Sequence, residues 1–348
     1  MNPQGNHNHR HNPSADMHLV TWDVVGSVTF SQPIGYLANG RDFDGTLGNA
    51  EKAMDYFSWV GCIPSLDHWF DKNPIYRIGP PGFGTITGIS IKHLIDRYQG
   101  SDSDYHDPAV PDFLDKFIEA KNASPDTVND NQIVSWLMIN MIAGADTTAV
   151  TIRSAIYYSL KTPGVWARLR SELAAAGLTK EQCPLSHKVT RNLPYLGAVV
   201  REALRYLPGV SLGLERYVPS GGQSLPDGSV VPENTILAFN PWIICRDKNA
   251  FGADAHLFNP ERWLQTEDET KEQFEERLQV MNNADLSFGG GSRICIGKHL
   301  GLMETFKVVS TLAVLYDIEL AHPDKDWKII NSWFPRQEGL EVKMSKRT

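Results

Sequence analysis

A glycine-rich stretch ending in a cysteine carries the strongest chemical signal in the chain: Phe288-Gly289-Gly290-Gly291-Ser292-Arg293-Ile294-Cys295-Ile296-Gly297. Successive glycines let the backbone pass close to a flat ligand and direct N–H groups toward a sulfur atom. Cys295 comes just before a predicted helix, and the positive end of a helix dipole favours the thiolate form that binds iron. The alternative is a phosphate-binding glycine loop, but the Lys-Ser/Thr ending of such a loop is absent. The spacing therefore predicts a thiolate ligand for a metal.

Two further side chains of this stretch suit that role. Arg293 precedes Cys295 by two residues and can bind a carboxylate of the ligand in a charge-assisted hydrogen bond. Phe288 is expected to shield the sulfur from water. A metal-bearing ligand with carboxylate groups is therefore the expected occupant.

A second motif, Ala143-Gly144-Ala145-Asp146-Thr147-Thr148, lies in the middle of a long predicted helix. Inside a helix, glycine alone costs about 1 kcal/mol of stability relative to alanine, so we expect a functional role that offsets this loss. The Thr147 hydroxyl is predicted to bond the Ala143 carbonyl one turn back, loosening the helix and opening a groove for dioxygen, with Asp146 relaying protons. The alternative is a threonine kink in a buried helix.

Glu202 and Arg205 form a third pattern, because their i, i+3 spacing places them on one helix face. Such pairs are common on exposed helices and contribute little there. This helix is otherwise apolar, so we expect the pair to be buried and to need further partners.

The elements that position these residues are mainly helical with minor sheet. The pattern of residues 19–123 predicts amphipathic helices separated by Gly- and Pro-rich loops. We find no internal repeat and no long linker that would divide the chain into independent domains. One long helix is predicted at 129–160, ending at Lys161-Thr162-Pro163-Gly164. Further helices are expected at 163–176, 193–207, 266–279 (charged and solvated) and 296–315, and short strands at 228–237 and 327–344.

Composition narrows the function classes. The 348 residues are 41% hydrophobic with a net charge of −8, which argues against nucleic acid as a partner. Four widely spaced cysteines fit a reducing compartment, and we find no signal peptide or membrane-spanning run. His7, His9 and His11 lie in a polar segment, 1–18, that we interpret as a disordered tail and not a metal site.

The cysteine stretch resembles the Cys-ligand loop of cytochrome P-450 enzymes, with Phe288, Gly291, Arg293, Cys295 and Gly297 on pattern. The resemblance implies that Cys295 is the axial ligand of haem b, that Arg293 binds a haem propionate, and that Asp146 and Thr147 deliver protons during dioxygen cleavage. Pro260-Glu261-Arg262-Trp263 resembles the family's stretch whose Arg completes a Glu–Arg–Arg cluster. Glu202, Arg205 and Arg262 are therefore expected to be structural.

Several shorter matches resemble the filamentous-fungal branch of pisatin demethylase-like and benzoate hydroxylase-like enzymes, from about Leu19 to near the end. They are Leu193-Pro194-Tyr195-Leu196, Arg216-Tyr217-Val218-Pro219, Asn240-Pro241-Trp242, and Arg246-Asp247 followed by Phe251-Gly252. Cys245 departs from the pattern, since the family usually has His there, so one haem-edge or packing contact should differ. The resemblance also suggests substrate contacts, with core packing as the alternative: Ala143, Ser211, Leu212 and Leu214.

The family pattern implies a monooxygenase that inserts one oxygen atom of dioxygen into a small hydrophobic metabolite of secondary metabolism. Electrons would come from NADPH through a separate NADPH-cytochrome reductase. The expected location is the cytosol or the cytosolic face of the endoplasmic reticulum, with peripheral membrane association left open. Two alternatives remain: a non-catalytic haem-binding or scaffold paralogue, and a haem isomerase or dehydratase that needs no reductase.

Against the family pattern, the sequence begins near the fifth helix. The expectation is an N-terminally truncated fold without the membrane anchor, most of the larger sheet, and the helix whose Trp and Arg hold one propionate. Weak haem binding and self-association would follow.

Overall fold

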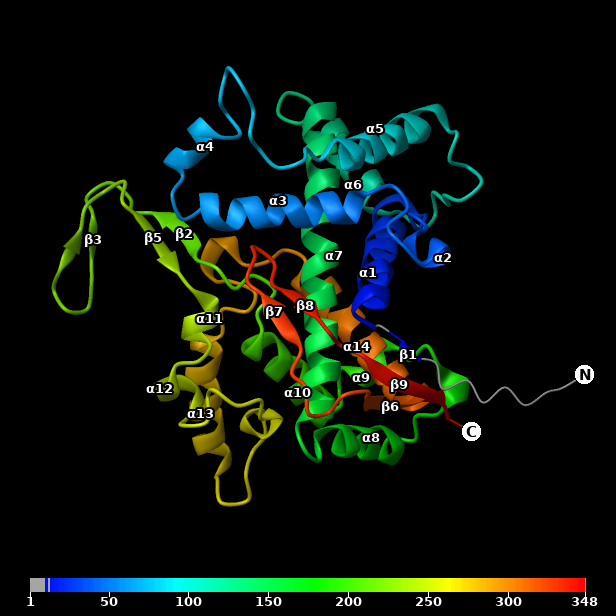
Figure 1. The fold of residues 1–348 in the computed structure, drawn as a ribbon, viewed down its shortest axis with the longest axis vertical. Coiled ribbons are helices and arrows are strands. Elements are labelled where there is room, and N and C mark those ends of the chain that lie inside the picture. The colour runs from blue at the N-terminus through cyan, green and yellow to red at the C-terminus, as the bar shows by residue number, and fades with distance from the viewer. Residues whose placement is uncertain (1–9, 12, 348) are drawn as a thin grey trace, which may run out of the picture. The chain divides into compact units, whose positions relative to one another are not determined.

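The computed structural model describes residues 10, 11 and 13–347, which form two compact units. Unit 1 contains the described residues up to Arg153 and those from Tyr316 onward, and unit 2 is Ser154–Leu315. Most of both units is helical, with a few short strands (Figure 1). The predicted class, mainly α with minor β, is confirmed.

Unit 1 is a set of helices with a small sheet. The helices are α1 (Pro13–Phe30), α2 (Tyr36–Asn39), α3 (Thr46–Val60), α4 (Ser65–Trp69), α5 (Gly84–Gln99), α6 (Phe113–Ala123) and the first part of α7 (Asp130–Lys161). An antiparallel sheet has the order β1 (Arg10–His11), β9 (Val342–Lys346), β6 (Tyr316–Leu320). A hairpin of β7 (Lys328–Ile330) and β8 (Arg336–Glu338) lies between β6 and β9 in sequence.

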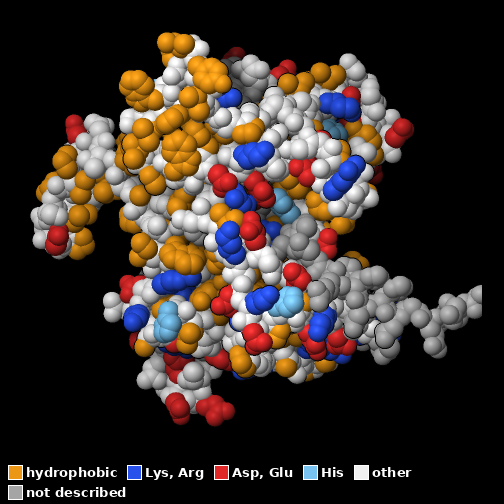
Figure 2. All heavy atoms as spheres, viewed as in Figure 1, with side chains coloured by type: hydrophobic (Ala, Val, Ile, Leu, Met, Phe, Trp, Pro, Cys, Tyr) orange, Lys and Arg blue, Asp and Glu red, His pale blue; other side chains and the backbone are white. Residues whose placement is uncertain are grey.

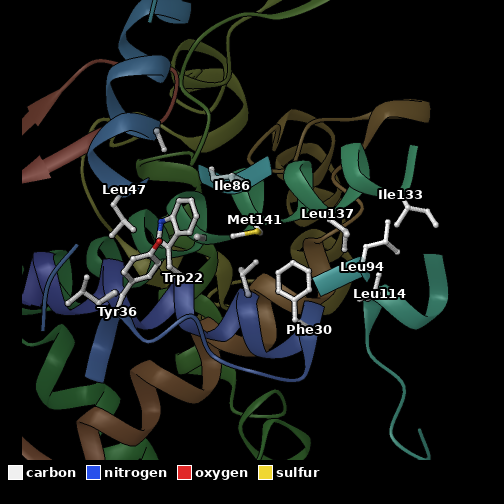
Figure 3. Packing of buried hydrophobic residues seen from close by; sticks show 14 residues of the cluster. Trp22, Phe30, Tyr36, Leu47, Ile86, Leu94, Leu114, Ile133, Leu137 and Met141 are labelled. Atoms are coloured by element: carbon white, nitrogen blue, oxygen red, sulfur yellow. The ribbon is translucent and has the colours of Figure 1, made fainter. Parts of the chain in front are cut away.

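The core of unit 1 lies where α1 packs against α7. Trp22, Phe30, Leu137 and Met141 are each fully buried, and Figure 3 shows their side chains within the cluster. A Cβ atom at Gly144 would lie only 3.0 Å from Cγ2 of Val25. Close approach of α1 therefore gives the mid-helix glycine a packing reason, beside any functional one.

Helix α7 is long and apolar enough to cross a membrane by length and composition, which differs from the expectation that no such segment exists. Its face toward α1 carries the fully buried Ile133, Leu137 and Met141, and its Asp146 accepts buried hydrogen bonds. We interpret α7 as a core helix. It ends where predicted, at Lys161, before Pro163 and Gly164, whose φ is +81°.

Unit 2 is also helical, with two small hairpins. Its elements are α8 (Val165–Ala175), η1 (Lys180–Gln182), α9 (His187–Thr190), α10 (Pro194–Tyr206), β2 (Leu214–Tyr217), β3 (Gln223–Ser224), β4 (Val230–Val231), β5 (Ile236–Phe239), α11 (Pro241–Ile244), α12 (Lys248–Phe251), η2 (Pro260–Trp263), α13 (Lys271–Ala284), η3 (Gly291–Arg293) and α14 (Lys298–Leu315). Strand β2 pairs with β5, and β3 with β4. Helix α14 packs against α8, α9 and α10, and α10 packs against η2.

Three predicted boundaries are wrong. The expected start of the fold at Leu19 is late, because α1 begins at Pro13 and β1 precedes it; His7 and His9 lie outside the described residues. The charged helix runs Lys271–Ala284, since Thr270 caps it and forms a capping box with Gln273. Helix α14 begins at Lys298 and not at Ile296.

Candidate functional site

The cysteine loop of unit 2 is closed by its own backbone. The Cys295 N–H donates to the Phe288 carbonyl at 2.8 Å, and the Lys298 N–H donates to the Cys295 carbonyl at 3.3 Å. Gly289 and Gly291 have φ of +70° and +64°, a conformation that glycine adopts without strain. The loop therefore needs glycine at these two positions to present the Cys295 thiol, which is exposed.

The surroundings of this thiol suit a flat, apolar ligand with carboxylate groups. Ile296 is 98% exposed and Ile294 is 49% exposed, on either side of the cysteine. The Arg293 side chain makes no hydrogen bond or ion pair within the described part of the chain. A thiolate donor is soft and binds iron in haem proteins, and an unpaired guanidinium suits a propionate. The residues present therefore fit haem.

The structure places the other loop residues as follows. The Gly297 Cα bears no side chain, and a Cβ there would lie 3.9 Å from the Cys295 sulfur. The Phe288 ring is half-buried and lies beneath the Lys298 ammonium, whose nitrogen is 5.5 Å from the ring centroid. Shielding of the sulfur by Phe288 stays a prediction.

The candidate substrate residues have different surroundings. Leu214 opens β2 beside the cysteine loop, with Cδ1 at 3.7 Å from where a Cβ of Gly289 would lie. Ser211 is buried, and its hydroxyl donates to the Pro208 carbonyl at 2.9 Å, so its side chain holds a turn. Leu212 is half-buried, and Ala143 is exposed on α7.

The Ala143–Thr148 motif of unit 1 shows the predicted hydrogen bond. The Thr147 hydroxyl donates to the Ala143 carbonyl at 2.8 Å, and Thr148 donates to the Gly144 carbonyl at 2.8 Å. Because the Thr147 proton is used in this way, its oxygen can accept a hydrogen bond from another donor. Helix α7 is nevertheless continuous through the motif, so the predicted loosening and groove are not seen.

Asp146 is held by α1 through two donors. Its Oδ1 accepts hydrogen bonds from His18 Nε2 at 2.6 Å and from Trp22 Nε1 at 2.9 Å. Burial opposes ionisation, but the nearby His18 and these two hydrogen bonds outweigh it and hold the pKa of the Asp146 carboxyl below its usual value. The sequence drew attention to Asp146, but His18 and Trp22 lie more than 120 residues away and no local pattern pairs them with it.

The Glu202 cluster of unit 2 is present as predicted. Glu202 and Arg205 are fully buried, with Arg205 Nη2 at 2.6 Å and Arg262 Nε at 3.1 Å from Glu202 Oε1. Trp263 Nε1 and the Asn259 N–H also donate to Glu202, at 2.9 Å and 2.8 Å. Arg205 in turn donates to three backbone carbonyls, those of Cys245, Ala255 and Leu257. The cluster therefore joins α10 to the irregular segment before η2.

Cys245, which departs from the family pattern, is a packing residue. Its side chain is fully buried and its Sγ is 3.9 Å from the Ala284 carbonyl. Burial raises the pKa of the Cys245 thiol to about 12. With Cys in place of His, the contact between the end of α11 and the end of α13 is a buried thiol that donates to a backbone carbonyl.

An apolar pocket of about 500 Å³ lies in unit 1, at α3, α4, α7 and the loop before β8. Its apolar lining includes Met54, Phe57, Val60, Ile142, Trp333 and Phe334, and Asp67, His68 and Lys72 contribute polar atoms. Ile142 directly precedes Ala143, but no sequence pattern pointed to the aromatic residues of the pocket.

Comparison with known proteins decides the family. The cytochrome P450 family model matches residues 1–343. The chain belongs to the cytochrome P450 family. This P450 chain is 45% identical to cytochrome P450 monooxygenase cfoH of Aspergillus candidus over 94% of the chain and 60% of that relative. It is 35% identical to cytochrome P450 monooxygenase cicH of Emericella nidulans over 95% of the chain and 65% of that relative.

A third relative, cytochrome P450 monooxygenase vrtE of Penicillium aethiopicum, is 34% identical over 94% of the chain and 64% of its own length. The P450 chain thus spans less than two thirds of the length of these curated relatives.

Proposed function

We propose that this P450 chain binds haem b through Cys295 and acts as a monooxygenase on a small hydrophobic metabolite of secondary metabolism. The observation that carries the proposal is the cysteine loop. It presents an exposed thiol on a glycine-built turn, with exposed isoleucines beside it and an arginine that has no partner among the described residues. A cysteine thiolate on haem iron favours cleavage of the O–O bond, which is the chemistry of oxygen insertion. The relatives named above are P450 monooxygenases, which supports this reading.

Within this proposal each residue has one role. Cys295 ligates the iron, Arg293 binds a propionate, and Gly289 and Gly291 let the loop adopt its conformation. Asp146 and Thr147 deliver protons: the Asp146 carboxylate takes and gives a proton, and the Thr147 oxygen accepts a hydrogen bond while its own proton is held by the Ala143 carbonyl. Glu202, Arg205 and Arg262 stabilise unit 2.

The substrate class follows from the pocket of unit 1. A volume of about 500 Å³ and a mostly aromatic and aliphatic lining suit a small apolar molecule. Among the predicted contacts, Ala143, Leu212 and Leu214 stay candidates because none of these side chains is fully buried. We assign the chain to the pisatin demethylase-like and benzoate hydroxylase-like branch on the motifs described above.

Electrons would come from NADPH through a separate reductase, at the cytosolic face of the endoplasmic reticulum. Peripheral membrane association is supported by the surface over α3, α4 and the loop after α4, where Figure 2 shows hydrophobic side chains gathered. Trp69 is 71% exposed, Ile75 is 95% exposed and Tyr76 is 72% exposed. Aromatic and aliphatic side chains of this kind favour a lipid interface.

The test is a reduced carbon monoxide difference spectrum of the purified, haem-reconstituted chain. The wild-type protein should give the red-shifted Soret band of a thiolate ligand, and Cys295→Ala should not. Cys62→Ala is the matched control, since Cys62 is also exposed and should leave the band unchanged. A thiolate band that survives in Cys295→Ala would disprove the assignment, and dependence of product formation on NADPH separates oxygen insertion from isomerisation.

A further inference from the structure

Three titratable side chains from three helices lie in a row in unit 1. His18 of α1 stands between Asp146 of α7 and Glu51 of α3. Its Nε2 is 2.6 Å from Asp146 Oδ1, and its Nδ1 is 3.9 Å from Glu51 Oε1. The two ring nitrogens of one imidazole therefore face two different carboxylates.

Exposure increases along this row toward Glu51. The Asp146 side chain is 11% exposed, the His18 side chain 15% and the Glu51 side chain 40%. Glu51 is thus the member of the row that exchanges protons with solvent most easily. Burial raises the pKa of Glu51 above its usual value, which brings its protonated form closer to neutral pH.

The gap between His18 and Glu51 is too long for a direct hydrogen bond but matches one bridging water. A cavity of about 20 Å³ is lined by His18, Glu51 and Asp146, together with Ser332 of the loop before β8. This volume holds one water molecule. The fully buried Ser332 hydroxyl has no hydrogen-bond partner among the described residues and gives such a water a third polar neighbour.

We propose that Glu51 and His18 form the entry of a proton path through which solvent protonates Asp146. Glu51 gives its proton, through the bridging water, to His18 Nδ1, while the proton on His18 Nε2 passes to Asp146 Oδ1. One proton moves from Glu51 to Asp146 and no electron is transferred. Solvent then reprotonates Glu51, and proton exchange with water, which removes the proton from His18 Nδ1 and returns one to Nε2, restores the original tautomer.

The arginines around the row favour the ionised carboxylates, but at Glu51 burial outweighs them and keeps the pKa raised. From α7, Arg153 acts on both Asp146 and Glu51, and from β8, Arg336 acts on Glu51 while it pairs with Asp55 of α3 at 2.5 Å. Trp22 of α1 donates the second hydrogen bond to Asp146, but its indole N–H is only a donor and cannot relay a proton. A proton path thus runs through His18 and not through Trp22.

The role of this path in catalysis rests on the proposed monooxygenase function, but proton transfer along the path can be measured without haem. The probe is the exchange of the His18 Nε2 proton with water, followed by NMR on the full chain labelled with ¹⁵N-histidine. Glu51→Gln removes the proton-carrying group, so we expect exchange to slow by about tenfold or more. Ser332→Ala should slow it in the same direction, because the water loses one partner.

Glu119→Gln is the matched control, since Glu119 is exposed on α6 and pairs only with Lys116 among the described residues. Its exchange rate should equal that of the wild type. A downfield Nε2 proton in every variant shows that the bond to Asp146 is intact and that the protein is folded. Equal exchange rates in wild type and Glu51→Gln would overturn the proposal, because protons would then reach His18 by another route.

A second arm uses haem-loaded protein with a reductase. His18→Gln keeps an N–H donor for Asp146 but cannot relay a proton, so the ratio of peroxide to product should rise about tenfold at constant haem content. An unchanged ratio in an active preparation overturns the relay and leaves the monooxygenase proposal standing. Failure of the wild-type chain to bind haem overturns the proposed function, and the exchange measurement then decides on the relay alone.

Discussion

Replacement of Glu202 by Gln should remove a large part of the stability of unit 2. Glu202 is fully buried and accepts five hydrogen bonds, from Arg205 Nε and Nη2, Arg262 Nε, Trp263 Nε1 and the Asn259 N–H, at 2.6–3.1 Å. In Glu202→Gln one carboxylate oxygen becomes an NH₂ group that points its protons at other donors. The substitution also removes the negative charge between two buried guanidinium groups.

The magnitude follows from this environment. Breaking a buried ion pair by removing one partner costs about 3–5 kcal/mol, because the remaining charge is left uncompensated. Typical domains have a free energy of unfolding of roughly 5–15 kcal/mol, so the loss is a third or more of the total for most of that range. Arg205 also holds the carbonyls of Cys245, Ala255 and Leu257, so its displacement should loosen that segment.

The assay is urea unfolding followed by circular dichroism, with Glu261→Gln as the matched control. Glu261 is next to Arg262 in sequence and pairs with Arg168 at 2.5 Å, but both side chains are about half exposed, at 45% and 55%. Exposed pairs contribute about 0–1 kcal/mol. A loss in Glu202→Gln no greater than that in Glu261→Gln would refute the claim that burial makes the difference.

Three further substitutions test other parts of the structure. Burial raises the pKa of Glu304 to about 8, so the folded chain holds this proton while the unfolded chain releases it near pH 4.3, and stability should fall as pH rises between these values. Glu304→Gln should therefore gain about 1–3 kcal/mol in urea unfolding at pH 8 and nothing at pH 4; an equal effect at both pH values would contradict this. Gly144→Ala should lose about 1 kcal/mol in the same assay because of the 3.0 Å approach to Val25, and an equal loss in a Val25→Ala background would exclude that contact as the cause. Thr147→Ala should keep haem content but divert NADPH to peroxide, and unchanged product per NADPH would leave Thr147 as a helix residue only.

Local chemistry made part of the fold predictable. Helix α7 was expected at 129–160 and lies at Asp130–Lys161. It ends there because Pro163 and Gly164, which follow Thr162, do not continue the helix. Helix α10 has its proline at the first turn, as predicted. The Thr147 bond to Ala143 and the Glu202–Arg205 pair follow from helix geometry alone, since their partners are three or four residues apart.

Contacts between distant segments were not predictable in this way. His18 was assigned to a disordered tail because the residues before it are polar, yet its imidazole bonds Asp146 across 128 residues. Glu51 and Ser332 likewise reach the same cavity from α3 and from the loop before β8. Such pairings depend on which helix faces pack together. Amphipathic periodicity predicts that a helix face is buried, but it does not identify the element that packs against that face.

The rate at which the buried Cys245 thiol is alkylated reports how often unit 2 opens locally. A thiol whose pKa is raised to about 12 and whose sulfur is sealed between α11 and α13 should resist alkylation as long as these helices stay together. Cys62 and Cys295 are exposed and should react at once with the same reagent. The delay before Cys245 is alkylated therefore times the opening events of unit 2, peptide by peptide, in a mass spectrometer. A ligand that binds and stabilises this unit would lengthen the delay, so the measurement detects binding without any absorbance change of the ligand.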